Sequence, residues 1–114
     1  GSMLASEFRS LALAQPGSSE GQHHGHADFR LAGRIFATLD RSECIGVVRL
    51  SPARQHELLN ADHAGCEAAA GAWGRAGYTK IELALADTAW VAAALAHAAE
   101  FAFAASKARR RPKT

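Results

Sequence analysis

Apolar residues recur at helical spacing in separated parts of the chain. Leu4, Phe8 and Leu11 predict a first helix from about Leu4 to Ala14, which Pro16 and Gly17 end. Ser51 is a favourable N-cap ahead of Pro52, so a short second helix is expected to run to about Ala61. Asp87 is expected to cap a long helix that extends to about Lys107. Its apolar stripe comprises Val91, Leu95, Ala98, Ala102 and Ala105, with Trp90, Ala94, His97 and Phe101 beside it.

Between these helices the pattern favours strands. Four segments are predicted as strands: His24 to Leu31, Arg34 to Leu39, Ile45 to Leu50 and Thr79 to Leu85. In the last one, Thr79, Ile81, Leu83 and Leu85 alternate with Lys80, Glu82 and Ala84. Ser18 to Gln22 is expected to be a polar loop, and Gly71 to Gly77 an irregular connection anchored in the core by Trp73. This order predicts an α+β fold, a two-layer sandwich with the N-terminal and long C-terminal helices on one face of an antiparallel sheet.

Length and composition indicate a single globular domain. The chain has 114 residues, of which 48% are hydrophobic and 21% charged. We expect residues 1–2 to be a vector scar, residues 3–106 to form the domain and residues 107–114 to be a basic tail. The apolar run from Ala89 to Ala105 is interrupted by His97 and Glu100, so no membrane span is expected. Two cysteines without a paired spacing favour a reducing, cytoplasmic location.

The net charge of +2 is unevenly distributed. Residues 107–114 contain five of the 13 basic residues, so residues 1–106 hold eight bases and all 11 acids, a net charge of −3. Because nucleic-acid affinity depends on neutralised phosphates, such a body would need its arginines gathered on one surface, or the help of its tail. A solvated, frayed terminus is the alternative interpretation of that tail.

The hairpin formed by the first two predicted strands is the main functional candidate. A three-residue loop from Leu31 to Gly33 would pair Arg30 with Arg34 and Phe29 with Ile35. This register places Phe29, Ile35, Ala37 and Leu39 toward the core. The opposite face would then carry His24, His26, Asp28, Arg30, Arg34, Phe36 and Thr38.

Two opposed arginines beside an aromatic ring are typical of nucleic-acid surfaces. Arginines hold phosphates, and the ring of Phe36 offers a platform on which a base can stack. The alternative is that Asp28 neutralises Arg30 and Arg34, with Phe36 covered by a loop or a second chain.

The histidines suggest a weaker candidate. His24, His26 and Asp28 fall at alternate positions, which on a strand would align three metal ligands. Neighbouring Arg30 disfavours a cation, and no further ligand can be placed beside them, so we expect no metal and no cofactor. Ser42, Cys44 and Cys66 lack the context of a catalytic nucleophile, which favours a non-enzymatic protein.

Several motifs resemble the MmcQ/YjbR family. They are Asp28-Phe29-Arg30, Gly33-Arg34-Ile35-Phe36-Ala37, Val47-Val48-Arg49-Leu50 followed by Ser51-Pro52, and Ala72-Trp73-Gly74-Arg75. Related sequences often have lysine at the positions of Arg34 and Arg49, and proline at that of Ala27. The resemblance implies a frataxin-like (CyaY-like) fold and a double-wing mode of DNA binding by two β-hairpins.

These observations lead to one leading hypothesis and two alternatives. The leading one is a non-enzymatic, cytoplasmic nucleic-acid-binding protein whose contacts are Arg30, Arg34, Phe36, Arg49, Arg75 and Lys80. The first alternative is a protein-interaction or homodimerisation module that uses the open sheet face, because Phe36 and Val47 would need a cover there. The second is a small-ligand or metal-binding protein.

Overall fold

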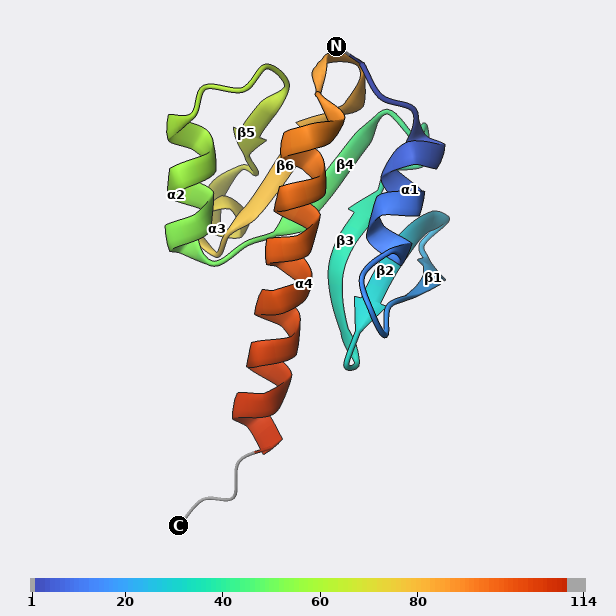
Figure 1. The fold of residues 1–114 in the computed structure, drawn as a ribbon, viewed down its shortest axis with the longest axis vertical. Coiled ribbons are helices and arrows are strands. Elements are labelled where there is room, and N and C mark those ends of the chain that lie inside the picture. Colours follow the sequence, from blue (N-terminus) through green and yellow to red (C-terminus); the bar gives the residue numbers. More distant parts are fainter. Residues whose placement is uncertain (1, 111–114) are drawn as a thin grey trace.

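The computed structural model of the chain describes the backbone of residues 2–110 and the side chains of residues 2–108. Figure 1 shows its elements in chain order. The helices are α1 (Ala5–Leu13), α2 (Pro52–Asn60), α3 (Gly71–Arg75) and α4 (Thr88–Arg110), with a 3-10 turn at Leu83–Leu85. The strands are β1 (Ser19–His23), β2 (His26–Leu31), β3 (Arg34–Leu39), β4 (Ile45–Arg49), β5 (Cys66–Ala68) and β6 (Tyr78–Glu82).

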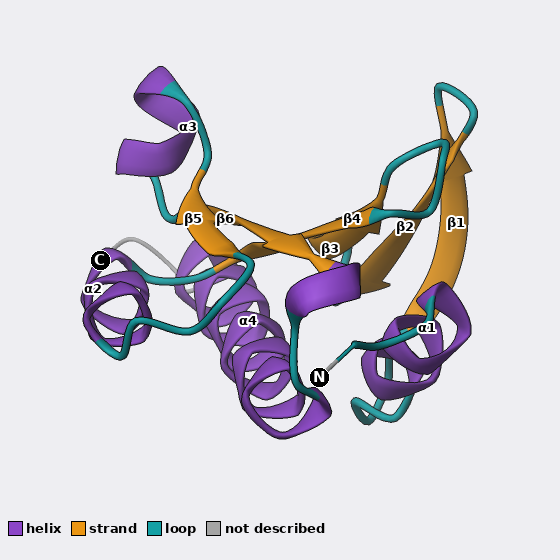
Figure 2. Ribbon diagram, turned by 90° about the horizontal axis from the view of Figure 1, so that it is seen from above, coloured by secondary structure: helices purple, strands orange, loops and turns teal. Residues whose placement is uncertain are grey.

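The strands form one antiparallel sheet in the order β1-β2-β3-β4-β6-β5. Seen along the sheet, α1, α2 and α4 lie together on one side, whereas α3 and the tip of the β1–β2 hairpin rise on the other (Figure 2). The predicted α+β two-layer sandwich, with the first and last helices on the same face, is therefore confirmed. The opposite face of the sheet, called the open face below, carries no long helix.

Helix α4 is the main cover of the sheet. The predicted stripe is the buried one, since Val91, Leu95 and Ala98 are fully buried and Ala102 nearly so. Beside the stripe, the indole of Trp90 stacks on the ring of His63 at 4.8 Å between centroids. Between Thr88 and Ala108 the helix is long and apolar enough to cross a membrane by length and composition alone, which differs from our expectation. A helix buried in a protein core meets the same criteria of length and composition, and in this structure the apolar stripe of α4 packs against the sheet.

Helix α1 docks through an aromatic contact over a glycine. The ring of Phe8 packs edge-on against Phe29 at 6.2 Å between centroids. A Cβ atom at Gly46 would lie 2.6 Å from the Phe8 ring, so only glycine at this position of β4 allows the close approach. Arg9, one residue on, forms ion pairs with Glu20 of β1 and Glu43 of the β3–β4 turn, which ties the helix to the sheet rim.

The register of the β2–β3 hairpin differs from the predicted one. Arg34 pairs with Leu31, so the loop is the two-residue turn Ala32-Gly33, with φ of 52° and 79° at its two positions. A β-bulge interrupts the ladder: Arg30 pairs with Ile35, but Phe29 pairs with Ala37. The bulge inserts one extra residue in β3 and thereby restores the apolar set to the core side.

The two-residue turn and the bulge together reverse the predicted faces of Arg34, Ile35 and Phe36. Phe36 is 1% exposed and belongs to the core, whereas Ile35 is 36% exposed. The prediction that Phe36 lies on the open face was therefore wrong, and so was the pairing of Arg30 with Arg34. The error arose because the alternation of side chains was continued through β3 without the extra residue.

Five other segments differ from the prediction. The expected loop at Ser18 to Gln22 contains β1, and β5 was not predicted. The alternating strand ends at Glu82, after which the chain forms a 3-10 turn. The connection at Gly71 to Gly77 contains α3, and Trp73 is 66% exposed instead of anchored in the core. Helix α4 runs on through Arg110, so the first half of the expected tail is helical, while Gly1 and residues 111–114 lie outside the described residues.

The β3 register can be tested by truncating two neighbouring side chains. We expect Phe36→Ala to lower the free energy of unfolding by about 3–5 kcal/mol, because it removes a fully buried ring. Ile35→Ala is the matched control and should cost about 1 kcal/mol or less. Urea denaturation of both variants measures the difference, and equal losses would contradict the bulged register.

Candidate nucleic-acid interface

The open face combines apolar, aromatic and charged side chains from five strands. The cross-strand pairs place Thr38 beside Val47, Val47 beside Lys80, and Ile45 beside Glu82 on this side. Arg49 is paired with Tyr78 at the end of the same ladder. These outward positions alternate with buried ones, since Val48, Thr79 and Ile81 are fully buried toward the helices.

A row of aromatic and arginine side chains crosses one end of this face. Trp73 of α3 contacts the ring of Tyr78 edge-on at 5.0 Å between centroids. The guanidinium of Arg49 lies 5.3 Å from the centroid of Tyr78 and 5.6 Å from that of Phe101 in α4. We call Trp73, Tyr78 and Arg49 the aromatic–arginine row. Its outer member is an indole that is 66% exposed, a large apolar surface left open to a ligand.

The local backbone explains why Trp73 points outward. A Cβ atom at Gly74 would lie 1.9 Å from the carbonyl oxygen of Ala69, so the glycine side of α3 is pressed against the preceding chain. The residue before it on a helix is rotated by about 100°, which directs Trp73 away from that contact. Nothing in the sequence pattern signals this orientation. Tyr78, in contrast, could have been assigned to the open face, because it stands two residues before Lys80 in the alternating strand.

Arg30 lies on the open face but is held by a carboxylate. Its Nε and Nη2 donate to the two oxygens of Asp28 at 2.7 and 3.0 Å. Asp28 is fully buried, and the hydrogen bonds from Arg30 hold its pKa below the ordinary value although burial acts in the opposite direction. Gly21, paired with Asp28, leaves the space for this ion pair, because a Cβ there would lie 2.8 Å from the carboxylate. The sequence alternative in which Asp28 neutralises a neighbouring arginine thus applies to Arg30.

Arg34 and Phe36 lie on the helix side of the sheet. Arg34 is paired with Leu31, which packs on the core, and lines a small notch with Arg49 beside α4. Arg34 is therefore separated from Arg30 by the thickness of the sheet, and Phe36 is unavailable for stacking.

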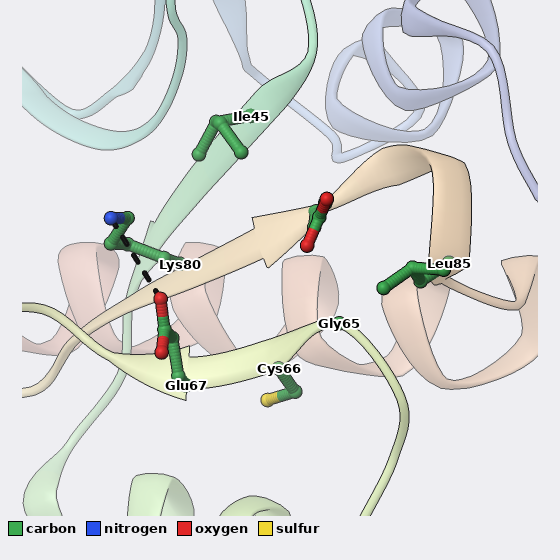
Figure 3. A pocket seen from close by; sticks show the side chains of 7 residues that line it. Ile45, Gly65, Cys66, Glu67, Lys80 and Leu85 are labelled. Carbon is green, nitrogen blue, oxygen red and sulfur yellow. Dashed lines mark ion pairs between the residues drawn. The ribbon is translucent and has the colours of Figure 1, made fainter.

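Of the two remaining predicted contact residues, Lys80 is half-buried and Arg75 is exposed, and they lie in different surroundings. The ammonium of Lys80 lies 3.8 Å from Glu67 of the neighbouring strand, and the two side chains point toward one another in Figure 3. They border a hollow of about 240 Å³ whose wall includes Cys66. Burial raises the pKa of the Cys66 thiol, so the protonated form is favoured and this hollow offers no activated nucleophile. Arg75, the last residue of α3, is exposed two positions after Trp73.

The histidines are brought together without forming a metal centre. His24 and Gly25 form the two-residue turn between β1 and β2, with φ of 49° and 81°, so His24 does not share a strand face with His26 and Asp28. His23 and His26 are cross-strand partners whose ring centroids lie 5.5 Å apart. Among the described residues, no group of three or more metal-ligating side chains could hold an ion. The proposed alignment of His24, His26 and Asp28 was therefore wrong.

The cations of the domain fall into two classes. Within residues 2–108, ion pairs involve Arg9, Arg30, Arg54 and Lys80. In that same range Arg34, Arg49 and Arg75 have no carboxylate within 4.0 Å of their guanidinium groups. Three of the predicted contact residues thus keep an uncompensated positive charge, and two of them lie in or next to the aromatic–arginine row.

Comparison with known proteins supports the fold. No protein-family model matches the chain, and no curated protein matches it. Among solved structures, it is similar to the crystal structure of the Deinococcus radiodurans protein DR2400, a domain of the family model DUF419. The two share 17% sequence identity with a TM-score of 0.66, over 81% of this chain and 72% of that chain. At this identity the likeness shows a shared fold.

The Asp28–Arg30 pair predicts a pH-dependent contribution to stability. Because the folded-state pKa of Asp28 is lowered, its contribution is fully present above the unfolded pKa and is lost as the pH falls through the folded one. We expect Asp28→Asn to lower the free energy of unfolding by about 1–2 kcal/mol at pH 7, since the Arg30 side chain is 45% exposed. Urea denaturation between pH 7 and pH 2 should show the gap closing at the acidic end. A gap independent of pH would contradict an ionised Asp28.

Proposed function

We propose that this protein binds nucleic acid on the open face, with the aromatic–arginine row as the centre of the contact. Trp73 and Tyr78 would stack on bases, while Arg49 and Arg75 would neutralise phosphates. Arg30 and Lys80 would add weaker attraction, because Asp28 and Glu67 already compensate much of their charge. The protein acts in this proposal as a binding module without catalytic chemistry.

The single observation that carries the proposal is the exposed indole of Trp73 in contact with the ring of Tyr78, over which the guanidinium of Arg49 lies. An apolar ring left 66% exposed loses the hydrophobic gain of burial unless a ligand covers it. The residues beside the indole indicate the kind of ligand. The guanidinium of Arg49, over the ring of Tyr78, attracts anions, and the two adjacent rings of Trp73 and Tyr78 favour planar groups. Nucleic acid supplies both a phosphate and a planar base at each step of the chain.

The placement of charge favours single strands over duplexes. A duplex contact depends on many phosphates, and residues 1–106 carry a net charge of −3. Stacking on a flat sheet, in contrast, needs unpaired bases and only a few cations beside them. The basic residues after Lys107 would contribute general attraction.

The structural neighbour is consistent with this class of protein. DUF419 is the MmcQ/YjbR-like family, whose proposed double-wing DNA binding the sequence motifs of this chain also imply. The β1–β2 hairpin and α3, which rise on the open side of the sheet in Figure 2, would border a strand lying across it. A fold shared at this level raises the expectation of nucleic-acid binding, and the row of this chain supplies the residues to test.

Truncation of the indole tests the proposal directly. We expect Trp73→Ala to weaken the binding of a single-stranded oligonucleotide by about 1–3 kcal/mol, the contribution of one stacked base, with little change in stability. Phe103→Ala is the matched control, because Phe103 is 51% exposed on α4, on the helix side of the sheet. Fluorescence anisotropy at two salt concentrations, with single-stranded and duplex DNA of equal length, measures both effects.

Three outcomes of these titrations are decisive. Weaker binding of Trp73→Ala alone supports the row as the contact. Equal weakening by both variants, or no binding by the parent chain, overturns the proposal. If the parent chain instead sediments as a dimer that Trp73→Ala dissociates, the open face is a self-association surface.

A further inference from the structure

The face of α4 that points away from the sheet is largely apolar. Its exposed or half-buried positions are spaced alternately by four and three residues: Ala89, Ala93, Ala96, Glu100, Phe103 and Lys107. This spacing is that of the contact seam between two packed helices. We call these six residues the outer seam. Each stands two residues from a member of the stripe that packs on the sheet, which is about 200° around the helix, so the sheet leaves the outer seam uncovered.

The outer seam has an exposed ring and a hollow beside it. The side chain of Phe103 is 51% exposed. A hollow of about 470 Å³ adjoins it, where α4 passes the end of β2 and the chain that follows α1, and its lining includes Pro16, Leu31, Ala96 and Glu100. Because a cavity of about 150 Å³ holds benzene, this hollow has room for a phenyl ring. The last turns of α4 extend past the end of the sheet along the long axis of the molecule, so a second chain can approach them (Figure 1).

Two charges on the outer seam indicate what covers it. Glu100 stands about one turn before Phe103 and Lys107 about one turn after it. The ammonium of Lys107 lies 5.7 Å from the centroid of the Phe103 ring, so its charge is at the seam. Within residues 2–108, neither Glu100 nor Lys107 has an ion-pair partner within 4.0 Å. The seam is therefore complementary in charge to a second copy of itself that runs in the opposite direction.

We infer that the outer seam is the interface of a homodimer in which two α4 helices pack antiparallel across a two-fold axis near Phe103. Each Glu100 then lies beside Lys107 of the second copy. Each Phe103 ring faces the hollow of the other chain, because that hollow lies along Ala96 and Glu100, on the N-terminal side of Phe103. The small side chain of Ala96 lets the two helices approach closely.

The same charges argue against other arrangements and occupants. A parallel pair would set Glu100 against Glu100 and would bring the basic C-terminal residues of both chains together, whereas the antiparallel pair keeps them at opposite ends. A carboxylate in the middle of the seam also disfavours an anionic lipid or a nucleic acid as its cover.

Charge reversal tests the interface in sedimentation equilibrium. We expect the parent chain to form a weak dimer, in the micromolar range or above, because the seam is a small interface. Glu100→Lys and Lys107→Glu should each weaken dimerisation by about tenfold or more, since the two-fold axis repeats every like-charge contact. Glu82→Lys is the matched control. It makes the same change in net charge at an exposed carboxylate of β6 and should leave the dimer unchanged.

Combined reversals distinguish a contact between chains from a general effect of charge. The double variant Glu100→Lys/Lys107→Glu restores both opposite-charge contacts and should dimerise like the parent chain. A mixture of the two single variants should form a heterodimer, because one chain then carries two cations at the seam and the other carries two anions. Phe103→Ala should also weaken the dimer, and circular dichroism verifies that every variant is folded.

Several outcomes would overturn the inference. One is a parent chain that stays monomeric up to about 1 mM. Another is a dimer that the single reversals leave unchanged, or that Glu82→Lys weakens equally. Single variants that neither the double variant nor mixing rescues would also count against it. Finally, if a monomer binds vesicles containing phosphatidylserine and Phe103→Ala abolishes that binding, lipid covers the seam instead of a second copy.

The interface and the proposed nucleic-acid contact can fail separately. Helix α4 lies on one side of the sheet and α3, with Trp73, on the other (Figure 2). Trp73→Ala should therefore leave dimerisation unchanged. Oligonucleotide titrations use a strand too short for two copies, so the loss of the dimer in Phe103→Ala does not change the affinity that they measure. A dimer that follows the charge reversals in a chain that binds no oligonucleotide supports the interface and overturns the proposed function.

Discussion

The structure depends on a conflict in the β2–β3 hairpin between the register that its turn sets and the side chains that the core must bury. Its two-residue turn, with both positions at positive φ, fixes Leu31 opposite Arg34 and would direct Phe36 and Ala37 to opposite faces of the sheet. Both are nevertheless buried, together with Phe29. One extra residue in β3 resolves the conflict, because it lets two consecutive side chains enter the core at the cost of a bend in the strand.

This bend determines which charges can act together. The two-residue turn pairs Arg34 with Leu31 and so separates it from Arg30; one arginine is neutralised by Asp28 on the open face, while the other remains unpaired on the helix side among the described residues. The bend ends the β3–β4 ladder early, and Arg49 can then contact both Tyr78 of the sheet and Phe101 of α4. A packing requirement of the core thus shapes the polar surface on both sides of the sheet.

The sequence predicted burial correctly where a pattern of apolar and polar residues extends over many positions, and wrongly where the pattern is short. The stripe of α4 and the alternation of β6 extend over several turns or pleats, so their buried sides were correctly predicted. Phe36 was misplaced because a bulge changes the alternation within a single residue and leaves no compositional mark. Trp73 was misplaced because a five-residue helix is too short for a periodic pattern, and the close approach of Gly74 to the carbonyl oxygen of Ala69 that orients it is a backbone contact that the pattern of side chains does not encode. The residue types alone indicated which arginines to consider as contacts. Which carboxylate or ring each arginine meets depends on tertiary contacts that the sequence pattern does not show.

The order of the strands also bears on how this protein avoids polymerising through its sheet. Both edges could template the addition of a foreign strand, as in amyloid, since their backbone groups face outward. One edge is β5, which is only three residues long and carries Glu67. The other is β1, a polar strand whose Glu20 is held by Arg9 of α1. Short length at one edge and charge at the other therefore disfavour edge-to-edge aggregation, so a partner of this sheet would approach its open face.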